Sequence, residues 1–164
     1  MKDNAAKYNA GSFSNGCLMP LLVQLAIAEE LGRAAVADTS LTHSNLVAQD
    51  AVRVFVLALQ DLIRGTAPKE VYQLTQQRAE TEQVGDILAS AAAPLEERQP
   101  ADGFLGNALR LAFQHLLQTD DLEQGLLSVM ELGSDTDTNG AIAGAVMGAK
   151  LGADAVPGEW RRVG

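Results

Sequence analysis

The sequence predicts an all-α protein. Apolar residues recur at three- and four-residue spacings in several stretches, the pattern of a helix with one buried face. No stretch alternates apolar and polar residues over the length of a half-buried strand. With 164 residues, of which 47% are hydrophobic, the chain is long enough to bury a core of its own. We therefore expect residues 1–164 to form one domain, a compact multi-helix bundle.

The charge and the cysteine content limit the classes of function. The net charge is −9, which opposes nucleic-acid binding because phosphate contacts need clustered Lys and Arg. The single Cys17 cannot form an internal disulfide, as is usual in a reducing compartment. The start of the chain is polar, and no apolar stretch reaches the length of a membrane span. These features predict a cytoplasmic protein that binds neither nucleic acid nor membrane.

The first half of the chain predicts two helices. Residues 1–13 show no periodic pattern and are expected to be a loop. Pro20 suits the first turn of a helix over Leu21–Leu31, which Gly32 would end. A longer helix over residues 45–64 would be capped by Thr42 or Ser44 and ended by Gly65. Its apolar stripe is broad, which predicts burial on more than one side; the stripe comprises Ala48, Val52, Val54, Phe55, Val56, Leu57, Leu59 and Leu62.

The second half predicts further helices around one loop. The stretch from Pro94 to Gly103 is polar and bounded by prolines, so it is expected to be a loop. Thr119 or Asp120 would cap the helix that begins at Leu122, with Leu126, Leu127 and Val129 facing inward. The expected helices are 68–78, 83–92, 104–118, 122–132 and 140–152.

Glycines recur every four residues in the last expected helix. Gly140, Gly144, Gly148 and Gly152 would form a bare stripe along one side, because four residues advance the helix by just over one turn. Each glycine lowers helix stability by about 1 kcal/mol relative to alanine. Close approach of another backbone would offset this cost. Membrane dimerisation through such a stripe is the rival explanation, and Lys150 together with the short length opposes it.

Two carboxylates stand one residue apart just before this helix. In an extended segment Asp135 and Asp137 would face the same side, with Thr138 where the helix begins. Mg²⁺ is commonly held by one or two carboxylates together with water. The sequence therefore predicts a metal site at Asp135, Asp137 and Thr138. The alternative is a solvated turn in which Thr138 serves only as a helix cap.

The longer run around these residues favours the metal site. Residues 133–152 read GSDTDTNGAIAGAVMGAKLG, followed by Val156-Pro157 and Trp160. This run resembles the C-terminal signature of the ADP-ribosylglycohydrolases, with Ser134 where the family usually has a second glycine. The resemblance implies that Asp135, Asp137 and Thr138 hold part of a binuclear Mg²⁺ site. It also implies hydrolysis of the glycosidic bond between ADP-ribose and a protein side chain.

Two earlier segments extend the resemblance. Ser14, Asn15, Gly16 and Met19 match a family segment that lines the ADP-ribose pocket, although Pro20 replaces its usual arginine. That replacement removes five donors and a positive charge. His43, in Leu-Thr-His-Ser-Asn, resembles a family histidine near the ligand, whereas His115 lies in no motif and is interpreted as structural. The acids of Thr119-Asp120-Asp121 are interpreted as a helix cap rather than as metal ligands.

The resemblance covers only the C-terminal half of the family fold. The family's Thr-Asp-Asp metal triad and its G-D-x-x-G segment have no convincing counterpart here. Three hypotheses follow: a hydrolase segment completed by another chain, a non-catalytic nucleotide- or metal-binding module, or a protein that kept the fold for its surface. The expected partners are ADP-ribose or an ADP-ribosylated protein, and a complementary chain or a second copy in a homodimer.

Overall fold

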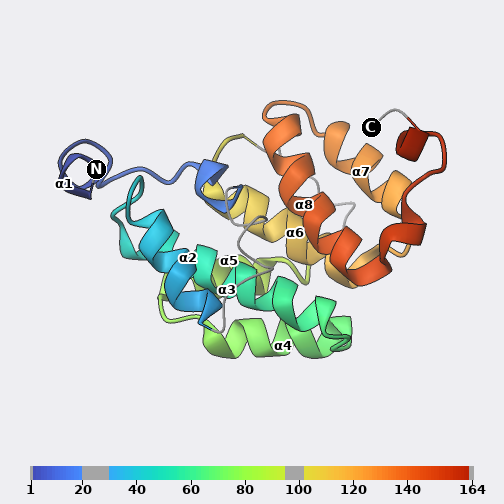
Figure 1. The fold of residues 1–164 in the computed structure, drawn as a ribbon, viewed down its shortest axis with the longest axis horizontal. Coiled ribbons are helices and arrows are strands. Elements are labelled where there is room, and N and C mark those ends of the chain that lie inside the picture. The colour runs from blue at the N-terminus through green and yellow to red at the C-terminus, as the bar shows by residue number, and fades with distance from the viewer. Residues whose placement is uncertain (1, 20–29, 95–101, 163–164) are drawn as a thin grey trace.

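The computed structural model describes residues 2–19, 30–94 and 102–162. Within these ranges the chain forms eight α-helices and no strand, which confirms the all-α prediction (Figure 1). The two ends of the chain lie at opposite ends of the molecule. The helices are α1 (Lys2–Tyr8), α2 (Leu31–Thr39), α3 (Leu46–Ile63), α4 (Pro68–Arg78), α5 (Glu82–Ser90), α6 (Leu105–Gln118), α7 (Leu122–Met130) and α8 (Thr136–Leu151), with 3-10 turns η1 (Asn15–Leu18), η4 (Ala153–Ala155) and η5 (Trp160–Arg162).

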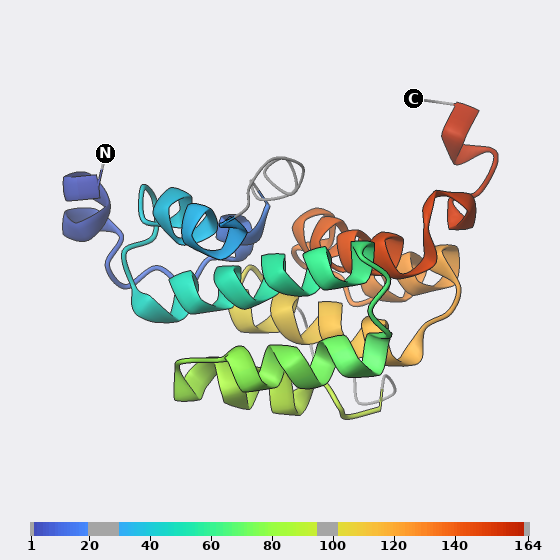
Figure 2. The same ribbon diagram turned by 60° about the horizontal axis from the view of Figure 1, so that its bottom comes forward.

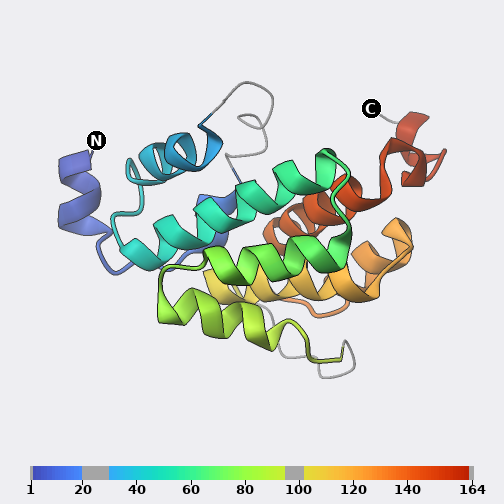
Figure 3. The same ribbon diagram turned by 90° about the horizontal axis from the view of Figure 1, so that it is seen from below.

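Helix α3 is the centre of the fold. It lies between α2 and α4 (Figures 2 and 3) and also contacts α5, α6 and α8. Val52, Val54 and Val56 point in different directions around the helix, and all three are fully buried. The prediction that this helix is buried on more than one side is therefore confirmed. Gly65 follows it with a φ of 89°, a conformation that favours glycine and ends the helix.

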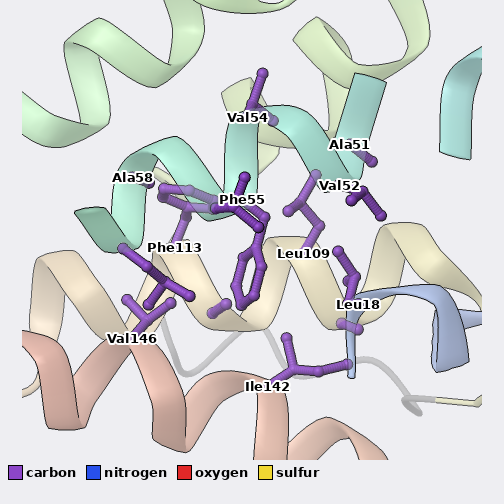
Figure 4. Packing of buried hydrophobic residues seen from close by; sticks show 14 of the residues in the cluster. Leu18, Ala51, Val52, Val54, Phe55, Ala58, Leu109, Phe113, Ile142 and Val146 are labelled. Atoms are coloured by element: carbon purple, nitrogen blue, oxygen red, sulfur yellow. The ribbon is translucent and has the colours of Figure 1, made fainter. Parts of the chain in front are cut away.

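One cluster of apolar side chains joins α3 to α6 and α8. Figure 4 shows Phe55 of α3 close to Phe113 of α6, with Ile142 and Val146 of α8 on the opposite side of the cluster. Phe55 and Phe113 are completely buried. Leu18 of η1 also joins the cluster, so the core fixes the segment around Asn15 against the first half of α8.

A buried carboxylate ties α3 to the turn between α4 and α5. Asp50 is only 4% exposed. One of its oxygens accepts hydrogen bonds from the backbone nitrogens of Glu80 and Thr81, at 2.9 and 2.8 Å, and from the Thr81 hydroxyl at 2.9 Å. The other oxygen pairs with Arg53 at 2.7 Å. This one side chain thus fixes the start of α5.

Two expectations for the first 32 residues are wrong. Lys2–Tyr8 forms the short helix α1 instead of a loop; its polar sequence carries no apolar periodicity that could reveal it. Gly32 lies inside α2 rather than ending a helix. A side-chain carbon at Gly32 would lie 3.4 Å from Arg53 Cγ, an ordinary contact distance, so the packing of α2 on α3 does not require glycine here. The rest of the helix expected over 21–31 falls outside the described residues.

Helix caps and ends differ from the predictions in detail. Asn45 caps α3, not Thr42 or Ser44, and its side chain accepts from the Ala48 nitrogen at 2.7 Å. Asp121 caps α7, so the helix-cap interpretation of residues 119–121 holds with a different residue in the role. Val129 is buried as expected, whereas Leu127 is 41% exposed and does not face inward. Helix α8 begins at Thr136, two residues before the start expected at Thr138 and four before the expected range 140–152.

The glycine stripe of α8 does not meet another backbone within the described parts of the chain. A side-chain carbon added at Gly140 or Gly148 would meet nothing within 4 Å, and one at Gly144 would meet only Leu126, a side chain, at 3.2 Å. The predicted close approach is therefore wrong for these ranges. None of the helices described here has the length and the hydropathy needed to span a bilayer.

Candidate functional site

Asn15 brings together two segments that are more than a hundred residues apart in the sequence. Its amide nitrogen donates to Asp135 Oδ2 at 2.7 Å and to Asn139 Oδ1 at 3.0 Å. An amide group carries two hydrogens, so these bonds use both. Asn15 and Asn139 are almost fully buried, with 3% and 1% of their surfaces exposed. The segment around Asn15 and the run that begins at Gly133 therefore meet in one cluster. The cluster comprises Asn15, Asp135, Asn139 and the neighbouring Asp137 and Thr138.

A short antiparallel pairing places Asn15 beside Gly103, just before α6. The Asn15 nitrogen donates to the Gly103 carbonyl at 2.9 Å, and the Leu105 nitrogen donates to the Phe13 carbonyl at 2.8 Å. A side chain at Gly103 would lie 3.2 Å from Asp135 Oδ2, which is tight for a carbon beside a carboxylate. Because Gly103 has no side chain, the Asp135 carboxylate has room beside residues 13–15.

The two aspartates stand at the start of α8. Asp135 is the N-cap residue and Asp137 lies in the first helical turn, so the expected extended geometry is wrong. Hydrogen bonding from Asn15, and then from Thr138, holds the pKa of Asp135 below its ordinary value. The carboxyl therefore stays ionised to lower pH than a free aspartate. Asp137 is exposed to solvent while Asp135 and Thr138 are half-buried.

The turn before α8 carries two consecutive residues with positive φ. Gly133 has a φ of 73° and Ser134 a φ of 63°. For a residue with a side chain this left-handed conformation costs about 1–2 kcal/mol. Ser134 is one position at which the sequence departs from the family signature, so this departure places strain next to the candidate site.

Replacing Ser134 by glycine should therefore stabilise the protein. We expect a gain of about 0.5–1 kcal/mol, because the relief of strain exceeds the extra chain entropy that glycine loses on folding. The midpoint of urea unfolding should rise accordingly. Ser134→Ala is the matched control, since alanine keeps the strain and should give no gain. Equal stabilisation by both substitutions would contradict this explanation.

The remaining predicted ligand residues lie around this cluster or apart from it. Ser14 is exposed, and its hydroxyl accepts from the Gly16 nitrogen at 3.4 Å as the cap of η1. His43 lies two residues before the Asn45 cap of α3 and is 9% exposed. Its Nδ1 is 3.0 Å from the Thr42 hydroxyl, and burial lowers its pKa. These contacts do not connect His43 to Asp135, and its ligand role stays a prediction.

His115 has the environment of a structural histidine. It is 1% exposed. Its Nδ1 lies 2.8 Å from the Leu111 carbonyl and its Nε2 lies 2.8 Å from the Ser128 hydroxyl. The ring thus links α6 to α7, in agreement with the structural interpretation from the sequence.

Two residues that contact Asn15 or Asp135 have no predicted role. Asn139 stands inside the quoted signature, and the sequence assigns it no contact of its own. Gly103 is the last residue of the expected polar loop 94–103. The polarity of Asn139 in the first turns of an otherwise apolar helix was the available signal, because a buried amide needs partners. No comparable signal marked Gly103.

The donor set suits a hard cation but is incomplete. Asp135, Asp137 and Thr138 offer only oxygen atoms, which Mg²⁺ prefers, and Mg²⁺ takes six ligands. No group of three or more His, Cys, Asp or Glu residues that could hold a metal occurs in the described ranges. These residues therefore fit as part of a Mg²⁺ site that needs water or another segment to complete it.

The chain is all-α in the described ranges, and Asn15 joins the segment around it to Asp135 and Asn139 at the start of α8. A sequence model of the ADP-ribosylglycohydrolases matches residues 1–163. The chain belongs to the ADP-ribosylglycohydrolase family.

Individual relatives agree with this assignment. A protein of Acanthamoeba polyphaga mimivirus named as an ADP-ribosyl glycohydrolase is 27% identical over 94% of this chain and 54% of its own length. The ADP-ribosyl-dinitrogen reductase glycohydrolase of Rhodospirillum rubrum is 24% identical over 94% of this chain and 52% of its own. A solved structure described as an ADP-ribosylglycohydrolase-related protein complex has a TM-score of 0.78 at 26% identity, covering 92% of this chain and 54% of that one. The chain thus spans about half the length of these relatives.

Proposed function

We propose that this chain supplies one part of a Mg²⁺-dependent site that hydrolyses the glycosidic bond between ADP-ribose and a protein side chain. The observation that carries the proposal is the hydrogen bonding of Asn15 to Asp135 and Asn139. It joins the two segments that resemble the family's pocket and metal motifs, and it leaves Asp137 open to solvent.

The residues of the cluster take different roles in this proposal. Asp135, Asp137 and Thr138 would hold the metal through their oxygen atoms. Asn15 would hold one oxygen of Asp135 in place through a hydrogen bond from its amide. The other hydrogen of this amide is bonded to Asn139. Bound Mg²⁺ would orient the ribose and polarise the reacting oxygen atoms. Ser14, Gly16 and His43 would contact the nucleotide.

The proposal requires partners. Asp135, Asp137 and Thr138 with water could hold a Mg²⁺ ion only weakly, and the binuclear site that the family resemblance implies needs ligands from another segment. We propose that a complementary chain or a second copy in a homodimer supplies them. The acidic net charge and the lone, buried Cys17, whose pKa burial raises to about 12, are compatible with action in the cytoplasm.

A non-catalytic binding module is the second candidate. It is favoured by the small number of metal-binding side chains, because only one pair of acids with Thr138 forms the cluster among the described residues. Calorimetric titration of Mg²⁺ and then ADP-ribose into the purified chain tests what the two candidates share, and binding of neither ligand contradicts both. Hydrolysis of an ADP-ribosylated peptide after addition of a complementary chain would support the hydrolase segment over the binding module.

The isolated chain should show little or no hydrolysis of ADP-ribosylated arginine or serine peptides. The loss of shared metal ligands removes both the positioned water and the stabilisation of charge in the transition state. Release of ADP-ribose can be followed by liquid chromatography with and without Mg²⁺. Robust Mg²⁺-dependent turnover by a chain shown to be monomeric would contradict this expectation.

A further inference from the structure

Both Asn-Gly sequences of the chain meet in the cluster at the start of α8. They are Asn15-Gly16 and Asn139-Gly140, whereas the other four asparagines precede alanine or leucine. The Asn15 amide nitrogen donates to Asn139 Oδ1 at 3.0 Å, so the two sequences touch although 124 positions separate them. Asparagine is lost most readily before glycine, because glycine has no side chain to hinder the reaction of its own backbone nitrogen.

The reaction at such a sequence needs only the chain and water. The glycine nitrogen gives up its proton and bonds to Cγ of the asparagine, while the bond from Cγ to the amide nitrogen breaks and ammonia leaves. Water then opens the cyclic imide at either of its two carbonyls. One product is aspartate, and the other is isoaspartate, in which the main chain runs through the side-chain carbons. Both products carry a new negative charge.

Helix α8 protects Asn139-Gly140 from this reaction. Both residues lie inside the helix and are buried. Ring closure requires the Gly140 nitrogen to turn toward the Asn139 side chain and so to leave the helical hydrogen-bond pattern. Ile142 and Val146 fix the same helix in the main core. Reaction at Asn139 therefore requires a large part of the fold to open.

Asn15-Gly16 is held less firmly. It begins η1, which is only four residues long. Gly16 is exposed to solvent, and its nitrogen donates to the Ser14 hydroxyl at 3.4 Å, longer than an ordinary hydrogen bond. Leu18 anchors the far end of η1 in the core, whereas residues 9–11 before it are exposed. Such short segments open locally at a lower cost in free energy than core helices.

We propose that Asn15 is a site of spontaneous deamidation, and that either product prevents the cluster from forming again. The Asn15 amide donates to Asp135 Oδ2 at 2.7 Å and to Asn139 Oδ1 at 3.0 Å. A carboxylate in its place would face two acceptors without a hydrogen to donate, and its charge would oppose that of Asp135.

The isoaspartyl product would also disturb the backbone. It lengthens the main chain immediately after the Asn15 nitrogen, which donates to the Gly103 carbonyl at 2.9 Å. The change is irreversible without a repair reaction, so local opening of this segment would gradually convert the chain to a form without the cluster. This proposal does not rest on the proposed hydrolase function, because it concerns only contacts within the chain.

The two Asn-Gly sequences are matched probes within one molecule. The folded chain and the urea-unfolded chain are kept in mildly alkaline buffer, and peptide mapping by mass spectrometry follows each asparagine. In the unfolded chain Asn15 and Asn139 should react at similar rates. In the folded chain both should react more slowly, and Asn15 should react at least several-fold faster than Asn139. Two results would overturn the proposal: reaction of Asn139 as fast as Asn15 in the folded chain, or no reaction at Asn15 by the time the unfolded chain is fully modified.

Gly16→Ala separates the chemistry from the fold. An added side-chain carbon there would lie 3.6 Å from Ser14 Oγ, an ordinary contact. The variant should slow deamidation of Asn15 at least several-fold and keep the urea midpoint. Gly140→Ala is the control, because a carbon there meets nothing within 4 Å, and it should leave the rate at Asn15 unchanged. An unchanged rate in Gly16→Ala would contradict attack by the Gly16 nitrogen.

Asn15→Asp reproduces the aspartyl product and tests its effect on the cluster. Its urea midpoint should be lower than that of the unmodified chain. Asn4→Asp adds the same charge at an exposed position on α1 and should leave the midpoint unchanged. The aged unmodified chain gives the same comparison without a substitution, since molecules modified at Asn15 should unfold at lower urea than the rest. Equal midpoints for modified and unmodified molecules would show that the product is compatible with the cluster and would overturn the proposal.

Discussion

Asp137→Ala should abolish Mg²⁺ binding by the chain, lowering the affinity by at least about tenfold and so beyond detection in calorimetry. Asp137 is the exposed carboxylate of the cluster, whereas one oxygen of Asp135 is already occupied by Asn15. Loss of the Asp137 carboxylate removes a full negative charge and one of at most three protein ligands of the metal. Thr138→Val, which removes only a neutral hydroxyl, should weaken binding by a smaller factor.

A loss of Mg²⁺ binding has meaning only if the variant stays folded and the effect is local. Asp154→Ala is the control for charge, because Asp154 is an exposed acid near the C-terminal end, next to Arg161. Its Mg²⁺ affinity should equal that of the unmodified chain. Retained binding in Asp137→Ala would show that these residues do not hold the metal, and the cap explanation of residues 135–138 would then replace it.

The sequence predicts α3 to α7 well, where apolar residues recur at helical spacing, whereas it does not predict α2. Helix α3 is the clearest case, because its broad stripe required partners on several sides and the structure supplies α2, α4, α6 and α8. Helix α1 was missed since its stability does not depend on an apolar face. Gly32 lies in the first turn of α2, where glycine lowers helix stability by only about 1 kcal/mol relative to alanine. A glycine in the sequence therefore does not by itself mark a helix end.

The candidate site was predicted in its residues but not in its geometry. The spacing of Asp135 and Asp137 suggested an extended segment, yet the helix dipole favours acids in the first turn, and α8 begins before Asp137. The bond between Asn15 and Asp135 spans 120 positions, and no local pattern reveals such a contact. Only the family resemblance placed the two segments near one ligand.

The buried role of Asp50 is equally invisible in the sequence. Asp50 lies in the second turn of α3, and the apolar pattern of that helix is strong enough to be recognised without it. A carboxylate on a buried face must be hydrogen-bonded or paired, so its position implied a partner but not which one. The partners lie 30 and 31 residues further along the chain.

Asp50→Ala should lower the free energy of unfolding by about 3–5 kcal/mol, because it leaves the partners of a buried, paired charge without their acceptor. The variant strands the backbone nitrogens of Glu80 and Thr81 and deprives Arg53 of its closest carboxylate. Asp50→Asn should cost less, since the amide oxygen can still accept some of these bonds. Urea unfolding gives the free energy of unfolding of the unmodified chain, of Asp50→Ala and of Asp50→Asn.

The exposed Asp86 provides the control for this prediction. It lies on α5, close to the same turn, and forms no ion pair among the described residues. Asp86→Ala should therefore change the stability by no more than about 0.5 kcal/mol. Since natural domains have a total stability of only about 5–15 kcal/mol, the loss at Asp50 would be a large part of the whole. A change below about 1 kcal/mol in Asp50→Ala would mean that α5 is positioned by its apolar contacts with α6, not by this carboxylate.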